Sequence, residues 1–369
     1  MSQFQFSTIF SERRKQMQVT QEDVAQFVGV SRAAVSKWEK GLSYPDITLL
    51  PKLAMYFDVS VDALLGYEPQ LTKDRIQAIY MELAKRFANE PFDDVLQRLD
   101  QLVAEYYSCY PFLMKIAQLL LNHMPVSPNV EATASKILAL CERVKHNTAE
   151  LSLLQEATAI KASVHLINQQ PEQVLQILGD QPAIEFSREL IIASALIQLQ
   201  RTEQAKEVLQ VTSFQKLLTL IGSLTETLLT EVEQPHYVDK TVQVTEQLLE
   251  LFGVKHMSMQ AVLMFYIKAA ITYALQQRSD EAKRMLKGYF KQCLQIQFPL
   301  KISGGDYFYK LEDWIANQLS IIQQAPRDER SIKIDLLRTI DQHPLLAPLL
   351  QDEQLSMYYK NLQHYLQEE

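Results

Sequence analysis

The sequence predicts an all-α protein with two parts: a small N-terminal domain of five short helices at residues 1–68, and a larger helical-repeat domain at residues 69–369. Only nine of the 369 residues are glycine, while leucine, glutamine, alanine and glutamate are common, a balance that favours helix. Apolar residues recur at helical spacing behind Ser, Thr, Asp or Pro, which are typical of helix starts.

The composition is that of a globular protein with sizeable cores, because 47% of residues are hydrophobic and 22% are charged. A net charge of −8 and a pI near 5.5 argue against broad, non-specific binding to nucleic acid. Residues 1–66 carry seven basic and seven acidic side chains, so the acidic excess follows residue 66. A neutral N-terminal domain leaves room for one local DNA-reading surface.

The three cysteines, Cys109, Cys141 and Cys293, are far apart and form no metal-ligand spacing. They predict neither a disulfide framework nor a zinc site, and we expect reduced, buried thiols. The N-terminus does not have the pattern of a signal peptide, and no run of about 18 apolar residues occurs. We therefore expect a cytoplasmic protein with no membrane partner.

The stretch at residues 20–41, TQEDVAQFVGVSRAAVSKWEKG, predicts two short helices joined by a tight turn. Thr20 caps the first helix, Gly29 ends it, and Ser31 caps the second. Val35 and Trp38 are the inner face of the second helix. Two short helices around a glycine-containing turn make a helix-turn-helix.

The flanking segments complete a small domain. Residues 6–17 form an amphipathic helix, and SYPD at 43–46 is a turn. Two further short helices follow at residues 46–58 and 60–66, each behind a capping residue, Asp46 or Ser60.

This part of the chain resembles the Cro/C1-type (XRE-like) helix-turn-helix regulators. The resemblance rests on residues 20–41, the YPD at 44–46 and the closing VSVDALLG at 59–66, and it covers residues 6 to 66. It implies that the second helix enters the major groove of a double-stranded operator. It also implies a structural pair between Arg14 of the first helix and Glu39 at the end of the second.

The resemblance implies a DNA-binding set of Gln21, Ser31, Arg32, Ala33, Ser36, Lys37, Ser43 and Tyr44. Arg32 and Lys37 are the expected base readers, because each can donate to guanine O6 and N7. Ala33 can touch only a thymine methyl, while Gln21 and the loop after the second helix would hold phosphates. Phage-type repressors often have paired amides where this chain has Arg32 and Ala33, so the operator sequence does not carry over.

The larger domain at residues 69–369, here called the body, contains a weak internal repeat. PEQVLQIL (171–178), TEQAKEVL (202–209) and SDEAKRML (279–286) each follow a longer apolar helix, at 153–170, 186–201 and 261–278. This cadence resembles degenerate tetratricopeptide-like units. The copies are offset by 31 and then 77 residues, which leaves room for an irregular helix pair around 214–252. A non-repeating helical bundle is the alternative.

The order of the two parts resembles the peptide-sensing regulators of Gram-positive bacteria, the Rgg/PlcR/PrgX-type group that serves quorum sensing. That resemblance implies a homodimer whose body binds a short peptide. Amides suit an extended peptide backbone, and the candidates are Asn122, Asn168, Gln198 and Asn317. The alternative is a helical scaffold that binds a protein partner or a small molecule, with the N-terminal domain only locating it on DNA.

The motifs of common enzymes are absent from the sequence. HExxH, GxSxG, P-loop and GxGxxG patterns do not occur, and the seven histidines are scattered. We expect no catalytic residues, no metal and no cofactor, and therefore no enzyme.

Overall fold

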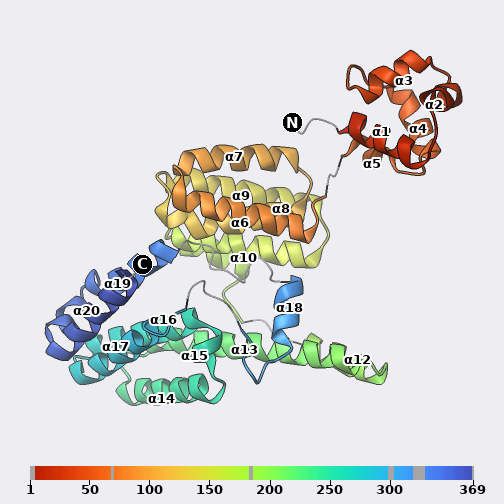
Figure 1. The fold of residues 1–369 in the computed structure, drawn as a ribbon. Coiled ribbons are helices and arrows are strands. Elements are labelled where there is room, and N and C mark those ends of the chain that lie inside the picture. Colours follow the sequence, from red (N-terminus) through yellow and green to blue (C-terminus); the bar gives the residue numbers. More distant parts are fainter. Residues whose placement is uncertain (1–4, 68–69, 183–185, 298–302, 319–328, 368–369) are drawn as a thin grey trace. The chain divides into compact units, whose positions relative to one another are not determined.

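A computed structural model describes residues 5–67, 70–182, 186–297, 303–318 and 329–367 (Figure 1). Within these ranges the regular structure is helical throughout, which confirms the all-α fold. The chain divides into two compact units, residues 1–79 with 90–177 and residues 80–89 with 178–369. The body predicted as one domain is thus shared between the two units, and the boundary at residues 68/69 stays a prediction.

The N-terminal domain, the head, consists of α1 (Phe6–Gln16), α2 (Gln21–Val28), α3 (Arg32–Glu39), the 3₁₀ turn η1 (Ile47–Leu49), α4 (Leu50–Tyr56) and α5 (Val61–Leu65). In its core, α1 packs against α3 and α5, and α2 packs against α3. The ring of Phe10 lies edge-on to those of Trp38 and Phe57, at centroid distances of 6.1 and 5.3 Å. The five predicted α-helices are present, and residues 46–58 divide into η1 and α4.

Local capping bonds set the ends of the two central helices of the head. Thr20 Oγ1 accepts from the Asp23 N–H at 3.2 Å, and Asp23 Oδ2 accepts from the Thr20 N–H at 2.7 Å, a reciprocal capping box. Gly29 ends α2 with a φ of +83°, which glycine adopts at little cost. Phe27 on α2 is exposed, with the centroid of its ring 4.5 Å from that of Tyr56 on α4.

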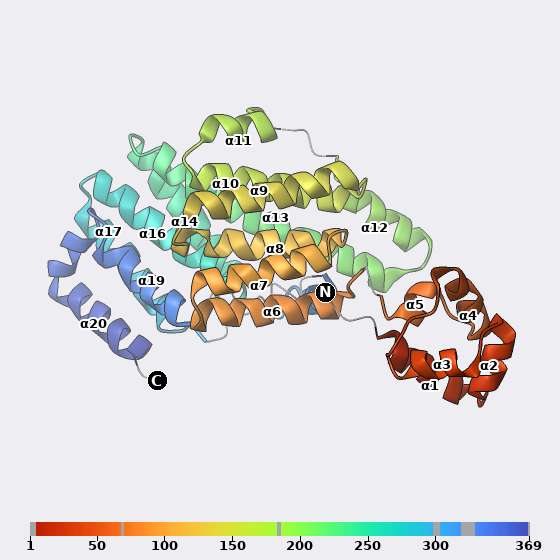
Figure 2. The ribbon, with the colours of Figure 1, turned by 90° about the horizontal axis from the view of Figure 1, so that it is seen from above.

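The other helices up to residue 178 are α6 (Lys73–Asn89), α7 (Phe92–Glu105), α8 (Tyr110–His123), the 3₁₀ turn η2 (Met124–Val126), α9 (Val130–Asn147), α10 (Leu151–Ile167) and α11 (Pro171–Leu178). Helices α8, α9 and α10 lie side by side and pack against one another (Figure 2). Cys109 and Cys141 are buried and free, as the sequence predicts.

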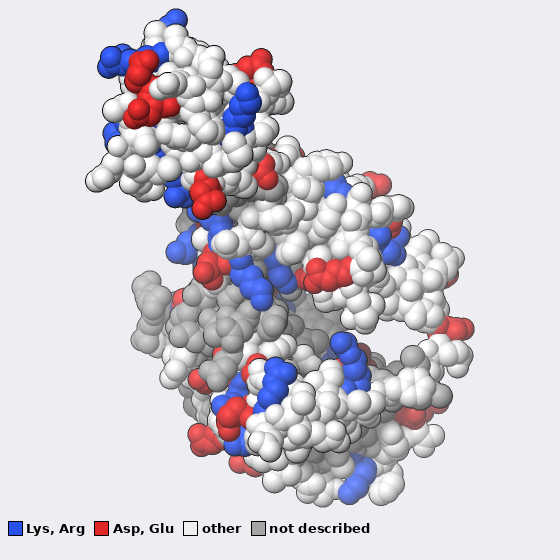
Figure 3. Space-filling view, turned by 90° about the vertical axis from the view of Figure 1, so that its right-hand side faces the viewer, with Lys and Arg blue, Asp and Glu red and all other residues white. Residues whose placement is uncertain are grey.

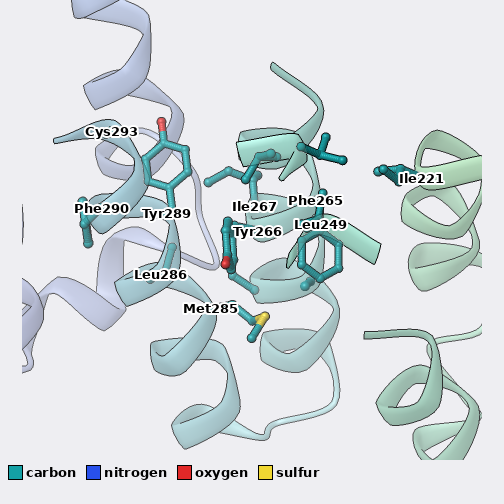
Figure 4. Packing of buried hydrophobic residues seen from close by; sticks show 14 of the residues in the cluster. Ile221, Leu249, Phe265, Tyr266, Ile267, Met285, Leu286, Tyr289, Phe290 and Cys293 are labelled. Carbon is teal, nitrogen blue, oxygen red and sulfur yellow. The ribbon is translucent and has the colours of Figure 1, made fainter. Parts of the chain in front are cut away.

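The second unit continues with α12 (Arg188–Gln198), α13 (Thr202–Thr230), α14 (Pro235–Leu251), α15 (Val254–Met257), α16 (Met259–Leu275), α17 (Ser279–Cys293), α18 (Leu311–Gln318), α19 (Glu329–Asp341), the 3₁₀ turn η3 (Ala347–Gln351) and α20 (Glu353–Gln367). Its core centres on the α16–α17 pair, where Phe265, Met285 and Tyr289 are fully or almost fully buried (Figure 4). Helix α13 runs unbroken through 29 residues. The irregular pair expected around 214–252 is therefore the second half of α13 followed by α14.

Three turns of the body share one backbone arrangement. Gln169, Gln200 and Gln277 follow α10, α12 and α16 with φ of 56°, 59° and 60°. In each turn the glutamine N–H bonds to the carbonyl three residues back and the next N–H bonds to the carbonyl five residues back, at 2.8–3.1 Å. This is the hydrogen-bond pattern of a Schellman ending. The same ending follows α1 and α4 in the head, at Gln18 and Asp58, so it is a common helix ending and not particular to the three repeated sequences.

Candidate nucleic-acid interface

Helix α3 has one buried and one exposed side. Val35 and Trp38 are almost fully buried in the head core. On the opposite side Arg32, Ala33 and Lys37 are exposed. Ser36, one turn beyond Arg32, is half-buried. The side of α3 that the sequence assigns to DNA is therefore the side that faces solvent.

The two cations of this face have no intramolecular role in the structure. Neither the Arg32 guanidinium nor the Lys37 ammonium makes a hydrogen bond or ion pair with any described residue. Both are free to donate to an external acceptor, and each matches the paired acceptors on the major-groove edge of guanine. Ala33 lies on the same exposed side, and its methyl side chain can make no hydrogen bond.

Arg14 and Glu39 lie together, which ties α1 to the end of α3. Arg14 Nε donates to Glu39 Oε1 at 2.5 Å, and Arg14 Nη1 donates to the Val19 carbonyl at 2.8 Å. Burial of Glu39 opposes its ionisation, but hydrogen bonds from Arg14 and Gln21 hold the pKa of this carboxyl below its ordinary value. Since Nη2 also faces Glu39, at 3.4 Å, the Arg14 guanidinium is engaged within the head.

Gln21, the expected phosphate contact, is the third member of this network. Its Nε2 donates to Glu39 Oε2 at 2.7 Å. Gln21 and Glu39 are 18 residues apart, and no local pattern in the sequence signals their contact. The bond fixes the side chain that begins α2 relative to α3, which carries the expected base readers Arg32 and Lys37. The phosphate contact itself stays a prediction.

The remaining members of the predicted set lie at the two ends of α3. Ser31 caps the helix, its Oγ accepting from the Ala34 N–H at 3.3 Å. In the loop after α3, Ser43 is half-buried, and the exposed Tyr44 has its ring 6.0 Å from that of Phe6. Leu42 in this loop and Ile47 directly after it are 71% and 78% exposed, which the sequence did not predict.

The surface of the head carries both signs of charge. On the face that Figure 3 shows, Lys and Arg are interspersed with Asp and Glu among many uncharged residues. This mixture matches the neutral balance of residues 1–66. A neutral balance of charge predicts only weak attraction to a phosphate backbone in general.

The four amides proposed for a peptide ligand fall in different parts of the chain. Asn122 on α8 and Asn168 at the end of α10 are half-buried and belong to the first unit. Gln198, at the end of α12, is exposed and belongs to the second. The side chain of Asn317 lies outside the described residues. No single site formed by all four is described.

The described ranges show neither a candidate metal site nor a candidate membrane-spanning helix. No group of three or more His, Cys, Asp or Glu there is arranged to hold a metal ion. None of the helices described combines the length and apolar character needed to cross a membrane.

Comparison with known proteins places the head among helix-turn-helix domains. Residues 10–64, from α1 to α5, match the family described as Helix-turn-helix. The HTH-type transcriptional activator BcrR of Enterococcus faecalis is 39% identical over 67 residues, 17% of this chain and 33% of that protein. The uncharacterized HTH-type transcriptional regulator YqaE of Bacillus subtilis (strain 168) is 28% identical over 111 residues, 27% of this chain and 90% of that protein.

No solved structure matches the chain. The chain spans a third of the length of BcrR, so that likeness concerns one domain. The head is thus an XRE-like helix-turn-helix domain similar to those of bacterial transcription regulators.

Proposed function

We propose that this chain is a sequence-specific DNA-binding transcriptional regulator that reads its operator with α3. The observation that carries the proposal is the exposed, unengaged pair Arg32 and Lys37 on a helix whose other side is locked into the core. A rigid helix that offers free donors at its outer face suits direct readout in the major groove. The likeness to helix-turn-helix regulators supports the same conclusion.

The regulator acts as a homodimer on a two-fold operator. A single small head buries about 600–1,000 Å² on DNA, which gives limited discrimination against competing sites. Two heads on half-sites about one helical turn apart multiply that discrimination.

The body is a degenerate tetratricopeptide-like array that dimerises and senses a ligand, most simply a short peptide. The three repeated sequences each follow an apolar helix, and α12 packs against α13 as α16 packs against α17, which supports a repeated helix pair. Stacked helix pairs make extended surfaces that suit a peptide or protein. Ligand binding changes operator affinity through the spacing or rigidity of the two heads.

Selection of bound duplexes from random sequence tests the head. The full-length protein should enrich a two-fold motif. In Arg32→Ala the preference for one base over the others at one position of each half-site should fall by about 1–3 kcal/mol, roughly 5- to 150-fold. Lys145→Ala, which removes the same charge from an exposed position of α9, is the control and should leave the motif unchanged. An Arg32→Ala variant with the wild-type motif and affinity would rule out Arg32 as a base reader.

Thermal-shift measurement against pooled short synthetic peptides tests the sensor. A pool that raises the melting temperature, with a smaller rise in Asn168→Ala, supports peptide binding near the end of α10. Gln101→Ala, exposed on α7, is the matched amide control. Stabilisation by small metabolites and by no peptide pool would favour the small-molecule alternative, and stoichiometric capture of one protein would favour the scaffold.

A further inference from the structure

Two lysines of the head have no role in the interface described above. Lys15 lies in the last turn of α1, and Lys40 directly follows the last residue of α3. Both side chains are exposed, and neither ammonium makes a hydrogen bond or ion pair with any described residue. Arg14, next to Lys15, is by contrast bonded to Glu39. The two lysines therefore carry positive charges that the head itself does not use.

Lys40 continues the exposed side of α3. Its backbone keeps a helical conformation, with a φ of −85° and a ψ of 0°. Arg32, Ser36 and Lys40 follow one another at intervals of four residues, so their side chains lie along one side of the helix. The N-terminal residues of a recognition helix meet base edges. Lys40 lies about 12 Å further along the axis than Arg32, and therefore beyond the bases that Arg32 is expected to read.

Lys15 approaches the same end of α3 from another helix. The bond from Arg14 to Glu39 joins the last turn of α1 to the last turn of α3. The chain then turns directly into α2, with the Gln18 N–H donating to the Lys15 carbonyl at 3.0 Å and Gln21 beginning the helix. Burial of Glu39 opposes its ionisation, but hydrogen bonds from Arg14 and Gln21 and the charges of Arg14 and Lys15 hold the pKa of this carboxyl below its ordinary value. Lys15 thus acts on the same carboxylate that Gln21 bonds.

The loop on the other side of α3 offers no such charge. Residues 41–49 contain neither lysine nor arginine, and Asp46 carries the one charged side chain among them. Its Oδ1 accepts from the Thr48 N–H at 2.8 Å, so a carboxylate caps the start of η1. A negative cap at this position disfavours a phosphate. The unpaired lysines next to α3 are therefore at its end with α1 and not in the loop.

We propose that Lys15 and Lys40 bind phosphates of the DNA backbone beside the expected contact of Gln21. The inference rests on the proposed function and deepens it, because it assigns the residues that hold the sugar-phosphate strand. A lysine ammonium has three donors and a compact charge, which suits a phosphate oxygen. Contacts to phosphates fix the position of a protein on the duplex and carry no sequence information.

The acidic residues of α2 leave this role open to the lysines. Asp23 is turned towards Thr20, whose N–H and hydroxyl both donate to its Oδ2 at 2.7 Å. Glu22 is exposed and makes no ion pair with Lys15 or Lys40. The two lysines offset the repulsion that these carboxylates exert on a phosphate, which is why their removal should be felt in the affinity for any duplex.

Binding of the selected operator by the full-length protein at a series of salt concentrations tests the proposal. Each phosphate contact contributes about 0.9 to the slope of log affinity against log salt concentration. Lys15→Gln and Lys40→Gln should each reduce that slope by about 0.9 and leave the order of base preference unchanged. Lys52→Gln removes the same charge from an exposed position on α4, and this matched control should keep the wild-type slope.

Three results overturn the proposal. The first is a wild-type slope in both lysine variants. The second is an equal reduction in Lys52→Gln, because the effect would then reflect only the net charge of the head. The third is a changed base preference in Lys15→Gln or Lys40→Gln, which would make that lysine a base reader. Lys15→Arg and Lys40→Arg, which retain the charge, should restore the wild-type slope and so exclude a folding defect as the cause.

A duplex without the selected motif separates this inference from the proposed function. The lysine variants should reduce the salt slope on this duplex as well, because every sequence carries the same phosphates. A protein that selects no motif but loses slope in both variants would keep the phosphate contacts and remove the sequence-specific regulator. Selection of a motif with unchanged slopes would do the reverse. A wild type that binds no duplex at any salt concentration overturns both.

Discussion

The ring of Tyr266 on α16 occupies the space beside Gly288 on α17: a Cβ added at Gly288 would lie 2.3 Å from Cε1 of Tyr266. Tyr266 is 8% exposed and packs within the α16–α17 core (Figure 4). A ring cannot yield by that much without moving its helix. Gly288 therefore sets how closely α16 and α17 approach.

Replacing Gly288 by alanine should destabilise the second unit by about 1–3 kcal/mol, the usual cost of overpacking a core. The loss of stability can be measured by the rate at which a thiol reagent labels Cys293 on α17. Burial raises the pKa of that thiol to about 12, so only unfolded molecules react. The rate should rise roughly 5- to 150-fold in Gly288→Ala.

The matched control is Gly222→Ala on α13, where a Cβ would meet nothing within 4 Å. Alanine is favoured over glycine inside a helix by about 0.5–1 kcal/mol, so this variant should slow the labelling of Cys293 or leave it unchanged. Similar rates in the two alanine variants would mean that α16 and α17 do not need the close approach.

The helix ends of the head were predictable because the interactions that set them are local. Thr20 with Asp23, and Ser31 with Ala34, are three residues apart, and the residue types that cap helices are few. The inner face of α3 followed from the spacing of Val35 and Trp38. Such features are determined by short stretches of chain, and they are the ones in which sequence and structure agree.

Features were not predictable where they depend on contacts between residues far apart in the sequence, or where no residue type marks the end of a helix. The bond from Gln21 to Glu39 joins residues 18 apart, and nothing in either segment marks the other as its partner. Helix α13 was divided in the prediction because one repeat was expected to end near residue 209, yet no proline follows before Thr230, and the helix continues through Thr212, Ser213 and Gly222.

Removing the charge of Glu39 should loosen the head. In Glu39→Gln the hydrogen bonds from Arg14 lose their ionic partner, at a cost of about 1–3 kcal/mol for bonds to a charged group. Hydrogen exchange of the α1, α2 and α3 amides in the full-length protein should accelerate accordingly. Glu12→Gln, an exposed position on α1, is the control and should exchange as the wild type does.

The same pair predicts the direction of a pH effect. The pKa of the folded-state Glu39 carboxyl lies below its ordinary value, so its stabilising contribution is fully present above the ordinary carboxyl pKa. It is lost as the pH falls through the lowered pKa, when Glu39 takes up a proton. Exchange in the head of Glu39→Gln should therefore approach that of the wild type in acid. A difference that stays constant down to the lowest pH would show that the charge of Glu39 contributes nothing.

Gln21→Ala should weaken binding to every duplex by a similar factor and leave the order of base preference unchanged. A phosphate contact positions a protein on DNA without carrying sequence information. Competition binding against the selected motif and against single-base variants of it measures both quantities. Gln26→Ala, exposed on the same helix, is the control and should bind as the wild type does. A changed base preference in Gln21→Ala would instead place Gln21 among the base readers.

The repeated turns make a prediction that depends on the backbone alone. A residue other than glycine in the left-handed region costs roughly 1–2 kcal/mol, and Gln277 holds a φ of +60° between α16 and α17. Gln277→Gly should therefore stabilise the second unit, by less than that cost because glycine also gains freedom in the unfolded chain. Its neighbour Gln276 has a φ of −76° and donates to the Val232 carbonyl, so Gln276→Gly should destabilise the unit. The labelling rate of Cys293 measures the change in stability of the second unit in both variants. If Gln277→Gly labels faster than the wild type, the glutamine side chain rather than the turn conformation stabilises this junction.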